Sequence, residues 1–295
     1  MSLDLLGKFN SLIRRGLGVL LTLGLLLGVL TPRAGGVPAR GVQSTSRGGD
    51  VHAPYARVIN PFAERALLYS SNGGDFDGFG DAVALSADGS LVVVGAPEAF
   101  GDGAGKAYLF AQPAGDWGGQ LTEAARRRAS DGRYRDHFGG AVAISDDGRT
   151  IVVGASEHFS TAGAVYVFEQ PAGGWSGTVM QTATLRASDP HHGDYLGGAV
   201  AISGDTIVAG AFGNDVGGNA EQGTLYLYLK PPTGWVSTTE SARLIASDGV
   251  TNDYLGGAVT RAGARVVAGA KGADVGSTLS AGATYLFEQP AGGWT

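Results

Sequence analysis

Residues 129–156 read ASDGRYRDHFGGAVAISDDGRTIVVGAS, and this stretch is one of four related copies that run from the mid-sixties to the last residues of the chain. Each copy closes on a tryptophan, namely Trp117, Trp175, Trp235 and Trp294, so the period is about 59 residues. A repeat of this length is a supersecondary unit that cannot bury its apolar side alone. The copies are therefore expected to stack against one another.

Apolar and small residues alternate within each copy, which predicts strands and not helices. In the second copy the alternating runs are AVAIS at 141–145, IVVGA at 151–155 and VYVF at 165–168. Asp147-Gly148 separates the first two runs, and Asp-Gly is a strong hairpin signal because glycine tolerates a positive φ. An outer segment opens each copy, such as ATLR at 183–186. Each copy is thus predicted to form about four antiparallel strands.

Tandem four-stranded units predict an all-β, β-propeller-type array of four antiparallel blades. The expected copies span about residues 65–124, 125–182, 183–241 and 242–295. The last copy ends after its third strand, while the first begins with an outer strand near residues 66–71. If that strand completes the last blade, the array is a closed small ring. The alternative is an open arc of a larger propeller, whose exposed blade faces would demand a partner and favour self-association.

Residues 1–39 have a different character from the repeats. Lys8, Arg14 and Arg15 precede an apolar stretch at residues 16–30, which is shorter than the roughly 20 residues of a spanning helix. This pattern is typical of a signal peptide, with an N-terminal membrane anchor as the alternative. Residues 40–64 read as a linker. The expected location is therefore secreted or cell-surface, with membrane contact only through an uncleaved N-terminal segment.

Composition narrows the possible functions. The chain has no cysteine, which excludes thiol catalysis and cysteine metal sites. The net charge is −6, and no basic face points to nucleic acid. The basic run Arg126–Arg128 lies in an outer strand, where it is interpreted as a solvated edge protected from aggregation by its charge.

The repeated unit resembles the FG-GAP repeat, which is related to the blades of the integrin α-subunit head. Phe79-Gly80 and Gly95-Ala96-Pro97 match both halves of the name, and the other copies carry Phe-Gly or Leu-Gly followed by Gly-Ala. The resemblance covers about residues 65–295. It implies a propeller on an exported or surface protein that binds ligands or other proteins. The connection between the two halves, such as Ser145 to Thr150, is too short for the acid-rich loop of calcium-binding integrin blades.

Paired polar residues are the most regular candidate site. Each copy carries an Asn or Asp followed five residues later by a second Asp, and the pairs are Asn72/Asp77, Asp131/Asp136, Asp189/Asp194 and Asp248/Asp253. With Asp75 these residues are the calcium candidates, and Asn214, Asp215, Asn219 and Glu221 form a second set. Two carboxylates fall short of the 6 to 8 oxygens that Ca²⁺ prefers. The preferred interpretation is therefore that the acids bond nearby backbone N–H groups and shape the turn.

Other candidates are weaker. His191 and His192 are adjacent, and adjacent side chains on extended backbone point to opposite faces. The tryptophan series fits blade packing better than a ligand platform. No nucleophile elbow, HExxH motif or P-loop is present in the sequence. The expected function is non-enzymatic binding of an extracellular protein or glycan. The alternatives are a hydrolase or lyase with a site at the propeller axis, and a structural or truncated fragment of a larger adhesin.

Overall fold

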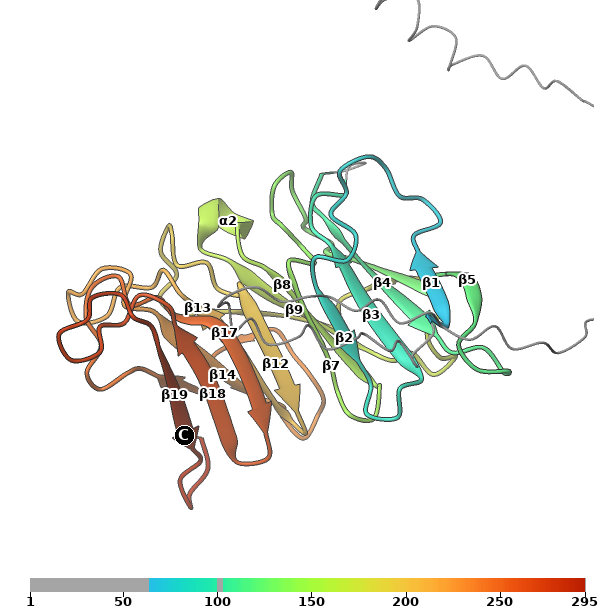
Figure 1. Cartoon of the computed structure of the whole chain (residues 1–295). Coiled ribbons are helices and arrows are strands. Elements are labelled where there is room, and N and C mark those ends of the chain that lie inside the picture. The colour runs from blue at the N-terminus through green and yellow to red at the C-terminus, as the bar shows by residue number, and fades with distance from the viewer. Residues whose placement is uncertain (1–63, 100–102, 295) are drawn as a thin grey trace, which may run out of the picture. The chain divides into compact units, whose positions relative to one another are not determined.

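The computed structural model describes residues 64–99 and 103–294, all within the unit that spans Asn60–Thr295 (Figure 1). The predictions for residues 1–39 and for almost all of the 40–64 linker lie outside the described residues. Within the described part, strands dominate and form successive sheets (Figure 1). The prediction of an all-β, propeller-type array of blades is confirmed.

Each sheet, here called a blade, is ordered from an inner strand outward. Blade 1 contains β2 (Val83–Leu85), β3 (Leu91–Ala96), β4 (Lys106–Ala111) and β6 (Ala125–Arg128). Blade 2 contains β7 (Ala141–Ile144), β8 (Thr150–Ala155), β9 (Ala164–Glu169) and β11 (Ala183–Arg186). Blade 3 contains β12 (Ala199–Ser203), β13 (Thr206–Ala211), β14 (Thr224–Leu229) and β16 (Ala242–Leu244). Blade 4 contains β17 (Leu255–Ala262), β18 (Arg265–Ala270) and β19 (Ala283–Glu288).

The fourth strand of each complete blade comes from the next copy of the repeat. β6 opens the second copy and pairs antiparallel with β4 of the first, with Arg126 opposite Tyr108. β11 pairs with β9 and β16 with β14 in the same register. Each copy is thereby joined to its neighbour by a ladder of backbone hydrogen bonds.

The sequence did not predict a further set of short strands after the tryptophans. β10 (Gly177–Met180) pairs parallel with β6, and β15 (Thr238–Thr239) pairs parallel with β11. β5 (Gly119–Thr122) pairs parallel with β1 (Ala66–Tyr69) in the same way. These segments lack the clear alternation of apolar residues that identifies a strand in sequence, so only the tertiary pairing reveals them.

The expectation that the first outer strand completes the last blade is wrong for the described structure. β1 pairs with β5, and blade 4 has three strands, with β18 as the partner of β19. β1 and β19 lie at opposite ends of the row of blades (Figure 1). β1 pairs parallel with β5 just as β6 pairs parallel with β10, so β1 takes the partner that the repeat provides for an opening strand.

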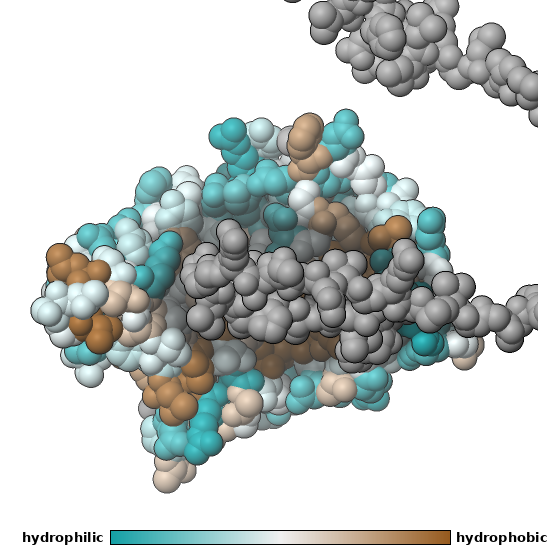
Figure 2. Space-filling view, in the orientation of Figure 1, coloured by the Kyte–Doolittle hydropathy of each residue, from teal (hydrophilic) through white to brown (hydrophobic). Residues whose placement is uncertain are grey.

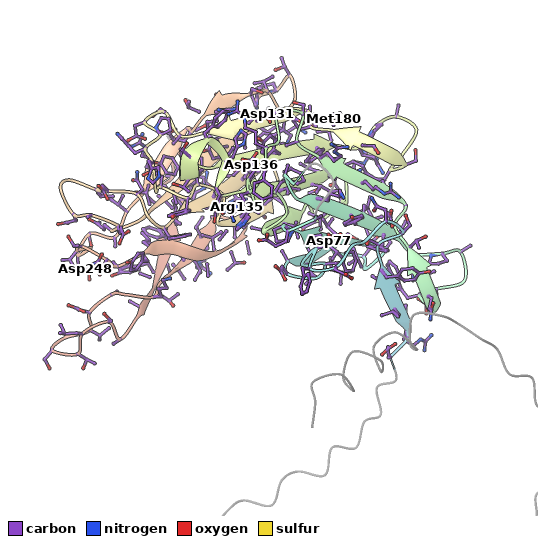
Figure 3. All side chains as sticks on the ribbon, turned by 90° about the horizontal axis from the view of Figure 1, so that it is seen from above. Asp77, Asp131, Arg135, Asp136, Met180 and Asp248 are labelled. Carbon is purple, nitrogen blue, oxygen red and sulfur yellow. The ribbon has the colours of Figure 1, made fainter. Side chains whose placement is uncertain are left out.

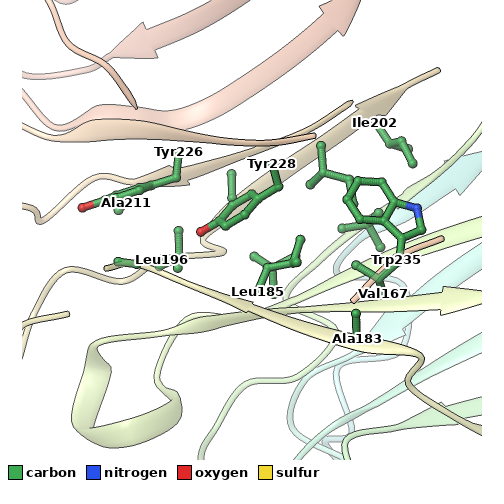
Figure 4. Close-up of a cluster of buried hydrophobic side chains, with 14 residues drawn as sticks. Val167, Ala183, Leu185, Leu196, Ile202, Ala211, Tyr226, Tyr228 and Trp235 are labelled. Atoms are coloured by element: carbon green, nitrogen blue, oxygen red, sulfur yellow. The ribbon is translucent and has the colours of Figure 1, made fainter. Parts of the chain in front are cut away.

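Apolar side chains fill the spaces between successive blades. Between blades 2 and 3, Tyr226 and Tyr228 of β14 pack over Val167 and Leu185 of blade 2, and all four are fully buried (Figure 4). Trp235 closes the outer end of this cluster (Figure 4). Burying one such side chain contributes about 1.5–3 kcal/mol, so these spaces hold the blades together.

The two glycines of the repeat meet at the interface between blades. A Cβ atom on Gly95 of blade 1 would overlap the carbonyl oxygen of Gly139 of blade 2. The same contact joins Gly154 to Gly197, and Gly210 to Gly256. Only glycine allows two backbones to approach so closely, which explains why both glycines recur in every copy.

Two local features differ from the sequence-based expectations. Arg127 is fully buried, so the basic run is not simply a solvated edge. Its outward neighbours in β6 are partly or fully exposed, as strand alternation requires. In addition, α2 (His158–Thr161) forms a helical turn in a chain where no helix was predicted, and its residues Phe159 and Ser160 have φ of 51° and 57°.

Candidate ligand-binding rim

Two sets of loops lie at the same end of the blades and are here called the rim. The opening loops precede the inner strands and comprise residues 72–79, 131–138, 189–196 and 248–254. The crossing loops join the second and third strands and comprise residues 97–105, 156–163, 212–223 and 271–282, of which residues 100–102 are not described. α2 belongs to this end of the molecule (Figure 1).

Backbone hydrogen bonds join each crossing loop to the opening loop of the next blade. Phe138 N–H donates to Ala104 O at 3.0 Å, and Leu196 N–H donates to Ala162 O at 3.1 Å. Leu255 N–H donates to Gln222 O at 2.9 Å. The rim is therefore a continuous surface across blades and not a series of independent loops.

The second Asp of each pair is buried and holds its own loop. Asp77, Asp136, Asp194 and Asp253 are 2–4% exposed. In each case Oδ2 accepts the backbone N–H of the residue three positions earlier, at 2.6–2.8 Å. The backbone carbonyl of each also accepts an N–H from the crossing loop of its own blade. These carboxylates thus tie the opening loop to the crossing loop.

The remaining contacts of the second Asp differ between copies. Asp136 Oδ2 lies 2.6 Å from Nδ1 of the fully buried His158. Asp194 Oδ1 accepts the amide of Asn214 at 3.1 Å. In the fourth copy the corresponding position is Ala273, and Asp253 Oδ1 has no hydrogen-bond partner among the described residues.

The first residue of each pair faces a tyrosine of the third strand instead of its paired acid. Tyr108, Tyr166 and Tyr226 donate their hydroxyls to Asn72, Asp131 and Asp189 at 3.2, 2.8 and 3.3 Å. Burial raises the pKa of Tyr166 and of Tyr226, and the neighbouring Asp adds to this in each case. The tyrosines therefore remain protonated donors at neutral pH.

Arginines from the next copy cover two of these acids. Arg186 Nη2 lies 3.2 Å from Asp131, and Arg243 makes two 2.7 Å hydrogen bonds to Asp189. Burial alone would lower the pKa of Arg243, but the hydrogen bonds to Asp189 and Glu240 outweigh it and raise that pKa. In the third copy the two acids thus have separate partners, whereas in the second copy His158 contacts both, with Nε2 3.4 Å from Asp131 and Nδ1 2.6 Å from Asp136. Among residues 64–99 and 103–294, no group of three or more His, Asp or Glu side chains is placed to hold a metal ion.

The remaining candidates of the sequence are distributed as follows. Asp75 is exposed. Asn214 also accepts the hydroxyl of Thr224, Asp215 accepts the N–H of Glu221, and Asn219 donates to Gly249 O. These contacts hold the crossing loop of blade 3 in place, and that of Asn219 joins it to the next opening loop. The His191 side chain is largely exposed, and its Nδ1 lies 3.9 Å from Asp194, beyond hydrogen-bonding distance.

The tryptophans lie at the opposite end of the interfaces from the rim, where they pack. Trp175, Trp235 and Trp294 are 3–9% exposed. Trp117 and Trp175 each donate their indole N–H to a carbonyl of the hairpin turn of their own blade, Gly89 O and Gly148 O, at 2.9 Å. Their geometry matches blade packing.

Exposed aromatic residues on the rim were missed by the sequence reasoning. Phe76 is 88% exposed and Tyr134 is 62% exposed. The position just before the second Asp has a positive φ in every copy, held by Phe76 (65°), Arg135 (69°), Gly193 (91°) and Asn252 (68°). Glycine and asparagine tolerate this conformation, whereas a bulky aromatic residue is an outlier. The signal was therefore present in the sequence, as a phenylalanine where the third and fourth copies have glycine and asparagine.

Charged side chains lie close to Tyr134 and Phe159 on the loops of blade 2. His137 lies 2.9 Å from Glu98 and 3.3 Å from Glu157, and so bridges two crossing loops. The Arg186 guanidinium lies 3.9 Å from the ring centre of Phe159. A hollow of about 420 Å³ is lined by Arg133, Tyr134, Arg135, Asp136, Glu157, Phe159 and Ser160. Figure 3 looks onto this end and shows Asp131, Arg135 and Asp136 gathered in one region, apart from Asp77 and Asp248.

Comparison with protein-family models gives four matches to the FG-GAP repeat, at residues 62–110, 121–168, 179–228 and 238–287. The matched segments extend from the opening strand of each copy to its third strand, so they include the paired acids and both interface glycines. A search of curated proteins found no match.

Proposed function

This chain belongs to the FG-GAP repeat family, and from that premise we propose that it is an exported, non-enzymatic binding module whose rim takes an extracellular protein or glycan. The observation that carries this proposal is the exposure of Phe76 in a conformation that disfavours it. An exposed phenylalanine gains nothing from the core, and backbone strain of this kind clusters at sites of function. Stability alone would favour the glycine of the third copy or the asparagine of the fourth.

The chemistry of the rim supports a ligand with both apolar and polar groups. Tyr134 and Phe159 supply aromatic faces, and Arg133, Arg135 and Glu157 supply charge at the same hollow. Aromatic and arginine side chains are enriched at protein interfaces, and tyrosine combines an apolar ring with a polar hydroxyl. A sugar ring or a protein loop can make both apolar and polar contacts of this kind.

Support for export comes from residues 1–39, with their basic start and apolar stretch. In the described part of the chain, no helix has the length and hydrophobicity needed to cross a membrane. Expression in an exporting host with N-terminal sequencing tests this point. Removal of about residues 1–39 is expected, and retention of Met1 on intracellular protein would contradict export.

The binding proposal is tested with the full-length protein on a glycan array and on a panel of immobilised extracellular proteins. Phe76→Asn keeps a residue that tolerates the positive φ, so it should fold at least as stably while losing about tenfold or more in binding. Val236→Ser is the matched control, because Val236 is 46% exposed and lies outside the rim.

Three results would overturn the proposal. The first is that Phe76→Asn binds as well as the wild-type protein, and the second is that neither panel shows binding. The third is catalytic turnover in a screen of glycosidic, ester and phosphodiester substrates that disappears when one rim carboxylate is changed. Such turnover would favour the alternative of an extracellular hydrolase or lyase.

A further inference from the structure

Each contact between blades needs two glycines, and at each end of the array one glycine of this kind has no partner glycine among the described residues. Gly269 of blade 4 corresponds to Gly95, Gly154 and Gly210, but the nearest atom to a Cβ placed on it is Ala258 Cβ at 3.8 Å. Gly80 of blade 1 corresponds to Gly139, Gly197 and Gly256, and nothing lies within 4 Å of a Cβ placed on it. Its φ of 103° matches the 88–99° of its counterparts Gly139, Gly197 and Gly256. The chain therefore carries both halves of a fourth contact of the same kind.

Apolar side chains show the same pattern at blade 4. Leu109, Val167 and Leu227 occupy one position of the third strand in the first three blades, and each is fully buried against the next blade. Leu286 is the corresponding residue of β19 and is 59% exposed. Apolar surface is visible over the β18–β19 edge (Figure 2). This face of blade 4 retains the residue type that an adjoining blade would bury.

Blade 1 presents the complementary face. Ile144 and Ile202 occupy one position of the inner strand in blades 2 and 3, and each is 8% exposed. The corresponding Leu85 of β2 is 61% exposed, and its neighbour Val83 is 67% exposed. In blades 2 and 3 the corresponding positions pack against the preceding blade, and in blade 1 they are exposed.

The strand edges are complementary as well. In each complete blade the third strand pairs antiparallel with an opening strand, as β14 does with β16. Among the described residues, β19 has no partner on that edge, and β1 is an opening strand paired only with β5. An unpaired edge of this kind is a template for another strand.

We propose that blade 4 binds blade 1 of a second copy of this chain, head to tail, with β1 of the second copy completing blade 4. The register follows from the internal blades, in which the third-strand tyrosine lies opposite the second residue of the opening strand. Leu67 of the second copy then lies opposite Tyr285, and Leu68 opposite Thr284. Contacts between two different faces form rings when the rotation closes and filaments when it does not. Two copies together supply eight blades, within the usual range of about 4 to 8.

One side chain makes the second copy a specific fit at the rim. Within one chain, Arg186 is the fourth residue of the opening strand β11, and it covers Asp131 of the preceding repeat. The fourth residue of β1 is Tyr69, which is 41% exposed. In the second copy it takes the place of Arg186 over Asp248, where its hydroxyl can donate a hydrogen bond to the carboxylate.

Disulfide formation between single-cysteine variants tests the register, because the chain has no cysteine of its own. Full-length Leu68→Cys and Thr284→Cys proteins with different tags are mixed and oxidised. A disulfide-linked heterodimer is expected. Leu67→Cys with Thr284→Cys is the control pair, which should not link because adjacent residues point to opposite faces of a strand. Association through residues 16–30 would not discriminate between the two pairs.

Analytical ultracentrifugation of two further variants tests the interface. Gly269→Ala should fold normally, since its Cβ meets nothing closer than 3.8 Å in one chain, but should lose self-association. Leu286→Glu should also become monomeric. The control is Val236→Glu, which changes an apolar residue that is 46% exposed and lies away from both end faces.

The proposal is overturned if the wild-type protein is a monomer at the concentrations used for cross-linking. It is also overturned if the double variant Leu68→Cys/Thr284→Cys forms its disulfide only within one chain, which would mean that the chain closes on itself. Equal linking of both cysteine pairs would likewise contradict it. These measurements use the protein without a ligand, so failure of this proposal can be told apart from failure of ligand binding at the rim.

Discussion

Arg127 shows how one residue can depart from the rule of its repeat. Its counterparts are Leu68, Leu185 and Leu244, yet the arginine is fully buried between blades 1 and 2. Nη1 donates to Arg126 O at 2.9 Å, and the guanidinium lies 4.3 Å from the ring centre of Trp175. Nε and Nη2 have no hydrogen-bond partner in the described residues, and burial lowers the pKa of Arg127 to about 10.

Arg127→Leu should therefore stabilise the protein, by about 1–3 kcal/mol, because it removes a buried charge that lacks a carboxylate partner. The lost contact with Trp175 limits the gain. Urea denaturation at neutral pH measures the change in the free energy of unfolding. Arg126→Leu is the control, since Arg126 is partly exposed and bonded to Glu123, and it should not stabilise. A lower midpoint for Arg127→Leu would contradict the prediction.

Asp88 gives a prediction on pH. Its carboxylate accepts the Ser86 hydroxyl at 2.6 Å and the Ser90 N–H at 3.0 Å within the hairpin turn of blade 1. These bonds, that of Ser86 foremost, lower the pKa of Asp88 to about 2 from its usual 3.8. Because the folded-state pKa is the lower one, the stabilisation is present above about pH 3.8 and is lost as the pH falls towards 2.

Asp88→Asn should therefore destabilise the protein at pH 6, and its difference from wild type should shrink between pH 4 and pH 2. Thermal unfolding across this range measures the effect. Asp146→Asn is the control, because it removes the same charge from a turn residue whose side chain makes none of these bonds, and it should not destabilise the protein at pH 6. A constant difference for Asp88→Asn down to pH 2 would refute the linkage.

At the scale of elements, the glycine pair decides how close the blades lie. The opening-strand ladders join the outer ends of neighbouring copies, and the glycine contacts join their inner ends. The large residue before the first glycine, such as Phe138, fills the space beside them and packs edge-on against Tyr166 with ring centres 5.4 Å apart. The two halves of the repeated motif thus serve one kind of contact, in which the second glycine of one copy meets the first glycine of the next.

Gly154→Ala and Gly269→Ala form a matched pair of substitutions on equivalent second strands. The first places a methyl group against the Gly197 carbonyl and should destabilise the protein by about 3 kcal/mol. The second meets open space in the single chain and should change the stability by no more than about 0.5 kcal/mol. Chemical denaturation under conditions that keep the protein monomeric compares them, and equal effects would disprove the role of the interface.

At the scale of the whole molecule, the paired acids hold the rim together through hydrogen bonds and ion pairs. The buried Asp oxygens accept backbone N–H groups, and the first acids accept tyrosine hydroxyls and bind arginines. A ligand that binds only the folded state must raise its stability.

Chelation should accordingly leave the melting temperature of the full-length protein unchanged. Differential scanning calorimetry with EDTA, and then with excess Ca²⁺, measures this. A melting temperature that falls with EDTA and recovers with Ca²⁺ would assign the metal role to the acid pairs instead. In that case Asp253 is the first residue to substitute, because its Oδ1 has no partner among the described residues.

The sequence by itself determined the repeat, the main antiparallel strands of each copy and the position of the hairpins, because these depend on local alternation and on turn residues such as Asp147-Gly148. It also located the acid pairs, since their spacing recurs with the repeat. The pairing of β1 with β5, the burial of Arg127 and the partners of each paired acid depended on tertiary structure. Each is a choice between competing partners distant in sequence, and the free energy of such a choice comes from packing that no local pattern encodes.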